Sequence, residues 1–197
     1  QLLLSLPVRL HDFEKVDNIF NLKNYEWHLS YQEIDEALTT IRNAFQERLK
    51  GKSFSIHLPD YISSRSLIDP FSRDDAIKDA SDYVVRRAVE LAVELQESTS
   101  NEVPIVGSFS VINNSKNEFY SGYSDLFTKI YKTSSVKILP QFLPRKAWYF
   151  GGAVELDTFC SIADLQYIKE LPFGICFDSA HCIMAANSEE QDFFDWM

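Results

Sequence analysis

Apolar and polar residues along the chain follow two alternating periods, one typical of buried strands and one typical of amphipathic helices. Short apolar runs bounded by polar, Gly or Pro residues predict six strands, over residues 6–10, 25–29, 53–58, 104–111, 136–140 and 174–177. Between them, apolar residues recur every three or four positions, which predicts helices on a sheet. These helices cover 12–20, 34–49, 75–97 and the region of 126–131, with two more beginning at Ser161 and Ser188.

Local signals mark where some of these elements begin and end. Ser30 and Glu33 have the spacing of a capping box, so each side chain is expected to bond to the other's backbone amide. Gly51 predicts the end of the helix that follows. Residues 60–72 and 141–160 are longer than ordinary connections, and residues 60–72 are expected to form a functional loop.

Strand and helix patterns alternate about every 30 residues, as they do in βαβ units with parallel strands. The fold class predicted is therefore α/β, a (β/α)8 TIM barrel that stops after about six βα units. Residues 1–197 would form one domain with strands seven and eight absent. Such a piece would expose strand edges and need a partner or another closure, and a six-stranded open sheet is the alternative.

Composition excludes several classes of partner. The chain has 197 residues, 45% of them hydrophobic, and a formal net charge of −10, which indicates a globular and acidic protein. No cluster of Lys and Arg stands out, whereas a protein that binds nucleic acid must neutralise phosphates. We expect neither a nucleic-acid partner nor a membrane partner.

The compartment expected is the cytoplasm. No apolar run approaches the ~20 residues that cross a bilayer, and the apolar start lacks the basic region and cleavage site of a signal peptide. Cys160, Cys176 and Cys182 are odd in number and form no CxxC pair. Free thiols in a reducing cytosol are the simplest interpretation.

Candidate chemistry gathers where the predicted strands end. Asp178 and His181 follow the sixth strand, and His11, His28 and His57 lie at the ends of the first three. The carboxyl ends of parallel strands share one rim of a barrel, which is where barrel enzymes hold their active sites. Imidazole and carboxylate groups on one rim suit a divalent metal, or general acid and base catalysis at neutral pH.

Each candidate has a structural alternative. Asp178 could cap the next helix, and the strand histidines could be ordinary core residues. Arg9 could bind an anionic group of a substrate, or pair with Asp12 or Asp178. Trp148, in a run of three aromatic residues, could line a sugar pocket or simply pack a loop over the barrel.

Three segments resemble the xylose-isomerase-like TIM-barrel superfamily, which includes sugar and sugar-phosphate isomerases and epimerases and the endonuclease IV type of nuclease. They are residues 56–59, 75–97 and 175–181, the last containing Asp178-x-x-His181. The resemblance covers most of the chain. More narrowly, residues 7–12, 26–31 and 148–152 are similar to the barrel module attached to bacterial sialic-acid-type (nonulosonate) synthases, which implies a fused or associated synthase domain.

The resemblance implies a divalent metal, Zn, Mn or Mg, on residues that include Asp178 and His181. Gln141 stands where the family has a Glu, so its amide would be an uncharged ligand. The ligands that the family takes from strands seven and eight are absent from this chain. His57 matches a histidine that some members use.

The leading hypothesis is a sugar or sugar-phosphate isomerase or epimerase that shifts a proton next to a carbonyl. Catalytic candidates are His57, Asp178 and His181, while Arg9, His28 and Trp148 would bind the substrate. Two alternatives remain. One is a non-catalytic sugar-binding or assembly module, and the other is a metal-dependent abasic-site endonuclease, which the acidic charge disfavours. Whether the chain forms a homo-oligomer stays open.

Overall fold

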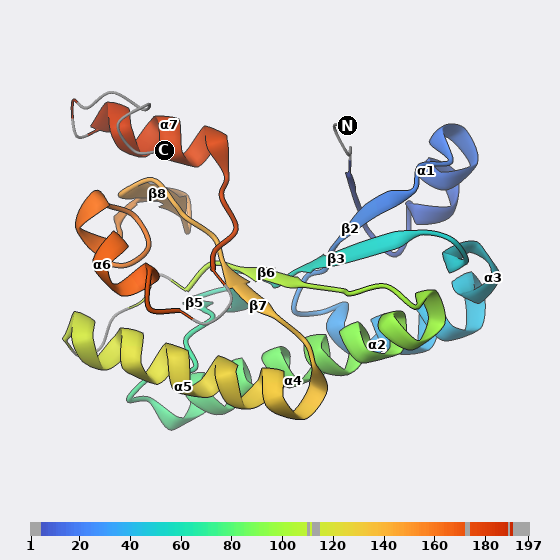
Figure 1. Ribbon diagram of the computed structural model, residues 1–197, viewed down its shortest axis with the longest axis horizontal. Helices are drawn as coiled ribbons and strands as arrows, with labels where there is room; N and C mark the ends of the chain where they lie inside the picture. Colours follow the sequence, from blue (N-terminus) through green and yellow to red (C-terminus); the bar gives the residue numbers. More distant parts are fainter. Residues whose placement is uncertain (1–4, 110, 112–114, 172–173, 189, 191–197) are drawn as a thin grey trace.

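The computed structural model describes residues 5–109, 111, 115–171, 174–188 and 190. Five short parallel strands form one sheet and lie in it in chain order (Figure 1). They are β1 (Leu6–Val8), β2 (Asn24–His28), β3 (Ser53–His57), β6 (Ile105–Gly107) and β7 (Ile138–Pro140). The predicted α/β class with parallel strands is confirmed. Among the described residues no strand joins β1 to β7, so closure into a barrel is not shown.

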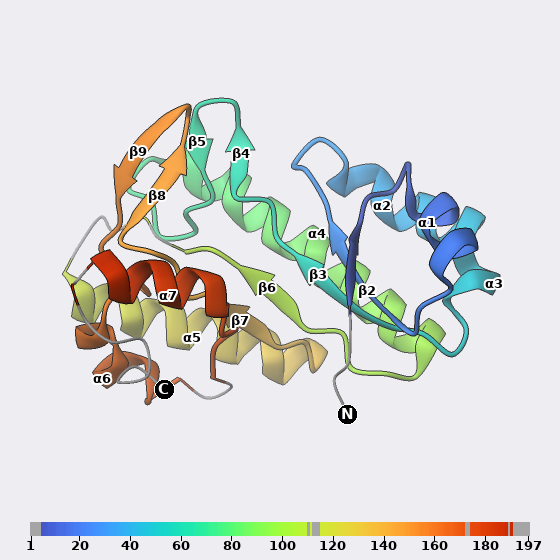
Figure 2. The same ribbon diagram turned by 90° about the horizontal axis from the view of Figure 1, so that it is seen from above.

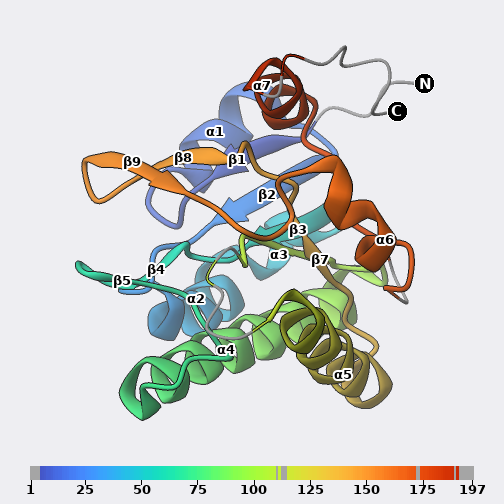
Figure 3. The ribbon, with the colours of Figure 1, turned by 90° about the vertical axis from the view of Figure 1, so that its left-hand side faces the viewer.

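Helices connect the strands, and three of them run along one face of the sheet. Figures 1 and 3 show α2, α4 and α5 beneath the sheet and α7 on its opposite side. The long helix predicted over 75–97 is confirmed as α4. The helical elements are α1 (Phe13–Phe20), α2 (Ile34–Thr40), the π-helical turn η1 (Ile41–Phe45), α3 (Gln46–Leu49), α4 (Asp75–Thr99), α5 (Lys116–Ser134), the 3-10 turn η2 (Ile162–Asp164), α6 (Leu165–Ile168) and α7 (Ser179–Ser188).

The two faces of the sheet differ because side chains alternate along each strand. The buried residues of β2 and β3 join the main apolar core with α4 and with Phe13 and Phe45; they are Tyr25, Trp27, Phe54 and Ile56. The residues between them are polar and only partly buried, and they form the inner face of the sheet; they are Glu26, His28, Ser55 and His57. This alternation sends polar side chains into the space under α7.

Two hairpins lie over the carboxyl ends of the strands. β4 (Tyr61–Ser63) pairs with β5 (Ser66–Leu67), and β8 (Lys146–Tyr149) pairs with β9 (Gly152–Glu155), both antiparallel. Figure 2 shows the two hairpins side by side. The ring of Tyr61 packs edge-on against Tyr149 and Phe150, with centroids 5.9 and 5.2 Å apart. The two long loops of the sequence are therefore ordered and packed on each other.

The sixth strand is a correction to the sequence prediction. Residues 174–177 were expected to be a buried strand, but only Cys176 pairs, through a single parallel bridge to Gln141. Cys176 is half-buried and Phe177 is 47% exposed. The bridge still continues the order of the sheet beyond β7. It sets Asp178, two residues later, beside the end of β7.

Helix boundaries differ from expectation at two places. α5 begins at Lys116, ten residues before its first predicted apolar position, because Ser115 and Glu118 form a full capping box. α7 occupies Ser179–Ser188, so a helix ends at Ser188 where one was expected to begin. Residues 191–197 of that prediction lie outside the described residues.

The two signals predicted at the ends of the helix over residues 34–49 have different outcomes in the structure. Gly51 has φ +72°, but the C-cap of α3 is Lys50, which is extended (φ −58°, ψ 126°). Gly51 lies in a turn closed by the Lys52 N–H to the Leu49 carbonyl at 3.1 Å and is therefore not the predicted cap. At the other end only half of the predicted capping box forms. The Glu33 carboxylate accepts from the Ser30 amide at 2.9 Å, while the Ser30 hydroxyl donates to that same carboxylate.

Candidate functional site

A cavity of about 740 Å³ lies between the carboxyl ends of the strands, the β8–β9 hairpin and α7. Its volume is within the range of small-molecule sites. The groups with candidate chemistry among its lining are Glu26, His28, His57, Gln141, Asp178 and His181. Five of these six were expected at the rim from the sequence, and the fold brings them together.

Gln141 lies at the centre of this group, directly after β7. Its Nε2 donates to Asp178 Oδ2 at 3.0 Å and lies 3.3 Å from His181 Nδ1. Its Oε1 lies 3.2 Å from His57 Nε2, and the Ser108 hydroxyl donates to the same oxygen at 3.5 Å. One amide therefore links the ends of β3, β6 and β7 to α7.

Asp178 has two roles, and the capping alternative is one of them. Its Oδ1 accepts from the backbone amide of His181 at 3.0 Å, as an N-cap does for a helix that starts at Ser179. Its Oδ2 faces the Gln141 amide and lies 3.3 Å from His181 Nδ1. The cap holds the carboxylate in place while leaving one oxygen directed toward the cavity group.

The spacing of three atoms bears on the expected metal. Gln141 Nε2, Asp178 Oδ2 and His181 Nδ1 form a triangle with sides of 3.0, 3.3 and 3.3 Å. Two ligands at 2.0–2.2 Å from a tetrahedral Zn²⁺ are about 3.3–3.6 Å apart, so only Asp178 Oδ2 and His181 Nδ1 have the spacing of two ligands, because the amide Nε2 offers a cation no lone pair.

The three groups are also a weak set of metal ligands by their chemical nature. A carboxylate and an imidazole are joined by a neutral amide, which here presents its N–H₂ group to the carboxylate. Among the described residues, no group of three or more His, Cys, Asp or Glu side chains is placed to hold a metal. The set fits a divalent ion only with Gln141 as a third, uncharged ligand.

His28 and His57 lie side by side in the cavity, at the ends of β2 and β3. Their rings stack with centroids 4.7 Å apart. The Nδ1 of His57 lies 2.8 Å from the Leu58 carbonyl oxygen and its Nε2 lies 3.2 Å from Gln141 Oε1, and a neutral ring, with one N–H, donates to only one of these two acceptors. The Nε2 of His28 donates to Glu26 Oε1 at 2.6 Å. The alternative that these two are core histidines is wrong, because both line the cavity.

Sequence reasoning missed Glu26 as a site residue, although a signal was present. Glu26 precedes His28 by two positions on one strand, and side chains two apart on a strand share a face. The hydrogen bond from His28 is the main cause that lowers the pKa of the Glu26 carboxyl, against the opposing effect of burial. Glu26 is therefore ionised at neutral pH.

A second chamber of about 550 Å³ adjoins the first and shares His28, His57 and Asp60 with it. Arg9 lines this second chamber, half-exposed, and its guanidinium pairs with Glu33 at 3.3 Å. The expected pairing of its side chain with Asp12 or Asp178 is wrong. Asp12 instead accepts from the backbone amide of Arg9 at 2.7 Å.

The structure also places two further candidate residues, Trp148 and His11, relative to the two chambers. Trp148 lines the first chamber and is 72% exposed, so it does not simply pack a loop. His11 lies off both chambers; its ring is largely exposed and 4.0 Å from Glu33. The rim expected to hold four histidines therefore brings three of them to the cavity.

The cysteines offer no nucleophile. Cys160, Cys176 and Cys182 are all free thiols, as expected from their number. Burial is the main cause that raises the pKa of each thiol, to about 12 for Cys160 and about 11 for Cys182. Since the thiolate is the reactive form, these residues are poorly suited to covalent catalysis.

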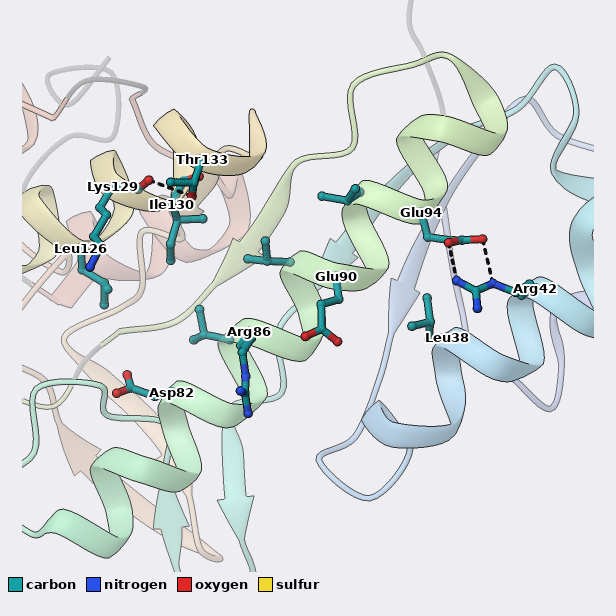
Figure 4. A pocket seen from close by; sticks show the side chains of 13 residues that line it. Leu38, Arg42, Asp82, Arg86, Glu90, Glu94, Leu126, Lys129, Ile130 and Thr133 are labelled. Atoms are coloured by element: carbon teal, nitrogen blue, oxygen red, sulfur yellow. Dashed lines mark hydrogen bonds and ion pairs between the residues drawn. The ribbon is translucent and has the colours of Figure 1, made fainter.

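Another hollow, of about 650 Å³, lies among α2, α4 and α5 on the helical side of the sheet (Figure 4). Its charged side chains pair locally, as Arg42 does with Glu94 at 2.6 Å, and no His or Cys lines it. The acid and base groups are in the cavity at the strand ends, so the candidate site is there.

No protein-family model matches the chain, and a search of curated proteins also finds no match. No helix in the described part of the chain is both long and apolar enough to cross a membrane. The class of the protein follows from its fold and site: an α/β protein with a polar cavity at the carboxyl ends of a parallel sheet.

Proposed function

We propose that the protein is a carbohydrate isomerase or epimerase that moves a proton next to the carbonyl of a sugar or sugar phosphate. The observation that carries this proposal is the cavity of about 740 Å³ in which His28, His57 and His181 lie with Glu26 and Asp178. Proton shifts next to a carbonyl need a base, an acid and a group that stabilises negative charge on oxygen. Imidazole and carboxylate groups supply all three at neutral pH.

The roles follow from the contacts. In the tautomer with its hydrogen on Nε2, His57 donates to the Gln141 amide oxygen, and a substrate carbonyl oxygen in that position would accept the same hydrogen bond. Asp178 and His181 act as the acid and base pair on the opposite side of Gln141. Trp148 offers an exposed ring beside the cavity, on which the apolar face of a sugar can pack.

The substrate can extend into the second chamber, where Arg9 offers a cationic group for a phosphate or carboxylate, in addition to Lys146 in the lining of the first. Glu33 already pairs with Arg9 and neutralises part of its charge. An anionic group of the substrate would therefore bind Arg9 by replacing Glu33 as its partner. In the metal-assisted form, Asp178, His181 and the oxygen of a turned Gln141 amide would instead hold a divalent cation, which would polarise the carbonyl of the substrate as a Lewis acid in place of their acid and base role.

The scaffold proposed for this chemistry is a barrel of the xylose-isomerase-like type. Its support is the order of the strands, which follows the chain from β1 to β7 with α2, α4 and α5 on one face. Doubly wound sheets instead reverse their strand order, and it is this order, not the placement of the helices, that favours the barrel, because α7 lies on the face opposite α2, α4 and α5. The similarity of residues 148–152 to a module of nonulosonate synthases supports a sugar-acid pathway in the cytoplasm, and the three free thiols agree with a reducing compartment.

One observation favours a second function, a sugar-binding module without catalysis. Gln141 satisfies Asp178 and His57 with a neutral amide, so the cluster is internally paired as it stands. A neutral amide such as that of Gln141 can still form hydrogen bonds with the hydroxyl groups of a sugar. The experiment below therefore measures binding and proton transfer separately.

The test is deuterium exchange in D₂O with a panel of free and phosphorylated pentoses, hexoses and N-acetylhexosamines, with MnCl₂ or with EDTA. The wild type should incorporate deuterium at the carbon next to the carbonyl of at least one sugar. Asp178→Asn should lower the rate by about 100-fold, the usual scale for one acid or base group. Exposed Asp125→Asn on α5 serves as the matched control with unchanged exchange.

The outcomes separate the candidate functions. Binding of a sugar without exchange, seen by calorimetry, would replace the enzyme with the binding module. Neither binding nor exchange across the panel would rule out both. Metal analysis of the purified protein adds a second measurement, since stoichiometric Zn or Mn that is lost in Asp178→Ala supports the metal-assisted form.

A further inference from the structure

The inner face of β2 carries a hydrogen-bonded pair that the proposed roles do not use. Glu26 and His28 are two residues apart, and their side chains meet at 2.6 Å between Oε1 and Nε2. The second oxygen of Glu26 accepts from the Ser55 hydroxyl of β3 at 3.1 Å. Both oxygens of the carboxylate are therefore engaged, and its orientation is set by two neighbouring strands.

This carboxylate fixes which nitrogen of His28 holds the proton. Glu26 is an ionised acceptor, so the Nε2 of His28 carries the hydrogen and its Nδ1 is left with the lone pair. Within the described residues no hydrogen bond to His28 Nδ1 is recorded. The neighbouring His57 differs, because its Nδ1 lies 2.8 Å from the Leu58 carbonyl oxygen.

The position of His28 suits a base. Its ring lines both chambers and stacks on His57, whose Nε2 faces the Gln141 amide oxygen. A sugar carbonyl bound at His57 would set the adjacent carbon near the ring of His28. A carboxylate that holds an imidazole in one tautomer and stabilises its cation is the arrangement that makes histidine an effective base.

We propose that His28 is the base that removes the proton next to the carbonyl, with Glu26 as its positioning residue. This inference rests on the proposed function, changes the expected role of His28 from binding substrate to reacting with it, and leaves Asp178 and His181 to move the proton at the substrate oxygens. The C–H bond breaks, its proton goes to Nδ1, and its electron pair forms the double bond of an enediolate as the carbonyl pair moves to oxygen. His28 then gives the proton to the former carbonyl carbon, while the proton of the neighbouring hydroxyl moves to the former carbonyl oxygen, so the isomerisation is redox-neutral.

The first test needs no substrate. Nitrogen-15 NMR of the histidine rings should show neutral His28 as the Nε2–H tautomer in the wild type. Glu26→Ala should shift it to a mixture of tautomers. Ser55→Ala, which removes only the outer hydrogen bond to Glu26, is the matched control and should keep the wild-type tautomer. A tautomer unchanged by Glu26→Ala would overturn the positioning role.

The second test uses the sugar that the wild type exchanges fastest. His28→Gln should lower kcat for deuterium exchange by about 100-fold with KM changed less than threefold. Glu26→Ala should lower kcat by at least tenfold and move the acid limb of the pH profile, which a loss of packing alone would not do. Wild-type exchange that persists at full rate in His28→Gln would refute this inference and leave the proposed function standing, whereas no exchange in the wild type would remove both.

Discussion

Gln141 is the residue on which the chemistry of the cavity depends most. Its amide joins Asp178, His57 and Ser108, and through them four elements of the fold. The amide N–H₂ group is the positive end of a dipole, and it occupies the corner of the triangle that a charged metal ligand would take. Whether the side chain at position 141 ends in an amide or in a carboxylate therefore decides whether the site binds a metal or is paired internally.

Gln141→Glu should therefore strengthen binding of a divalent cation. The added charge supplies the second carboxylate that hard cations favour. We expect the Kd for Mn²⁺ or Zn²⁺, measured by calorimetry, to fall by at least about tenfold relative to the wild type, or ~1.4 kcal/mol. Without metal the new carboxylate lies beside Asp178, so Tm should fall and then recover when metal is added.

The matched control is Gln32→Glu, which adds the same charge at an exposed position outside both chambers. It should leave the cation affinity unchanged. An affinity in Gln141→Glu no higher than in this control would show that Asp178 and His181 do not form part of a cation site.

At this scale the sequence predicted much of the site from position alone. Asp178, His181, His28 and His57 were expected at strand ends, and they line one cavity. Glu26 was missed because only residues at the ends of strands were considered as candidates. Glu26 lies two positions before His28 on the same strand, and side chains two apart on a strand lie on the same face.

Among the elements, a buried ion pair connects α1 to the start of β3. Lys52 Nζ lies 2.7 Å from Asp17 Oδ1, with both side chains less than a tenth exposed. Burial alone would raise the pKa of the Asp17 carboxyl. Hydrogen bonds from Lys52 and Tyr25, with the charges of Lys52 and Arg48, outweigh burial and lower that pKa. The carboxylate therefore stays charged inside the fold.

Lys52→Ala should lower the free energy of unfolding by about 3–5 kcal/mol, because it leaves a buried carboxylate without its main partner. Urea denaturation at pH 7 measures the loss. Lys50→Ala, which breaks an exposed pair with Glu47, is the control and should cost no more than about 1 kcal/mol. Equal effects of the two substitutions would contradict the prediction.

The same ion pair has a defined pH dependence. Since the folded pKa of Asp17 lies below the value of 3.8 for the free side chain, its stabilisation is fully present above that value. It is lost as pH falls from 3.8 through the folded pKa. Urea midpoints of wild type and Lys52→Ala should therefore converge as pH is lowered below about 4, and a constant difference down to pH 2 would show that Asp17 is not responsible.

Helix α5 shows which boundaries a periodic pattern cannot find. Its first turns are polar, so apolar spacing identified only the part near Leu126. The capping box of Ser115 and Glu118 determines the true start. Ser115→Ala should lower the free energy of unfolding by about 1 kcal/mol in urea, and Ser121→Ala, inside the helix, should not.

The predicted sixth strand failed for a different physical reason. An apolar run predicts burial, and residues 174–177 are apolar enough. A strand also needs a continuous ladder of partners, and here only Cys176 finds one. Apolar content therefore located the segment at the correct edge of the sheet without fixing how much of it pairs.

For the whole molecule, the sequence predicted the parallel α/β arrangement, because it follows from alternating periods and short connections. Closure of the sheet is a property of residues far apart in the chain, and local patterns do not contain it. The inner face, with Glu26 and Ser55 on it, is polar and partly exposed. Polar side chains there are compatible with a cavity facing solvent or substrate, and not with a dry core.

At this same scale, net charge weighs against the nuclease hypothesis. A nuclease must neutralise several phosphates, and the free energy of that contact comes from Lys and Arg on its surface. The chain has 19 Lys and Arg against 29 Asp and Glu, a formal charge of −10.

Repulsion from DNA should therefore keep the Kd for a fluorescent abasic duplex weaker than about 10⁻⁴ M at physiological salt, the weak end of non-specific binding. Anisotropy measures the affinity, and gel electrophoresis with Mg²⁺, Mn²⁺ or Zn²⁺ measures cleavage. Cleavage that disappears in Asp178→Asn would reverse this assignment and make the same cavity a nuclease site.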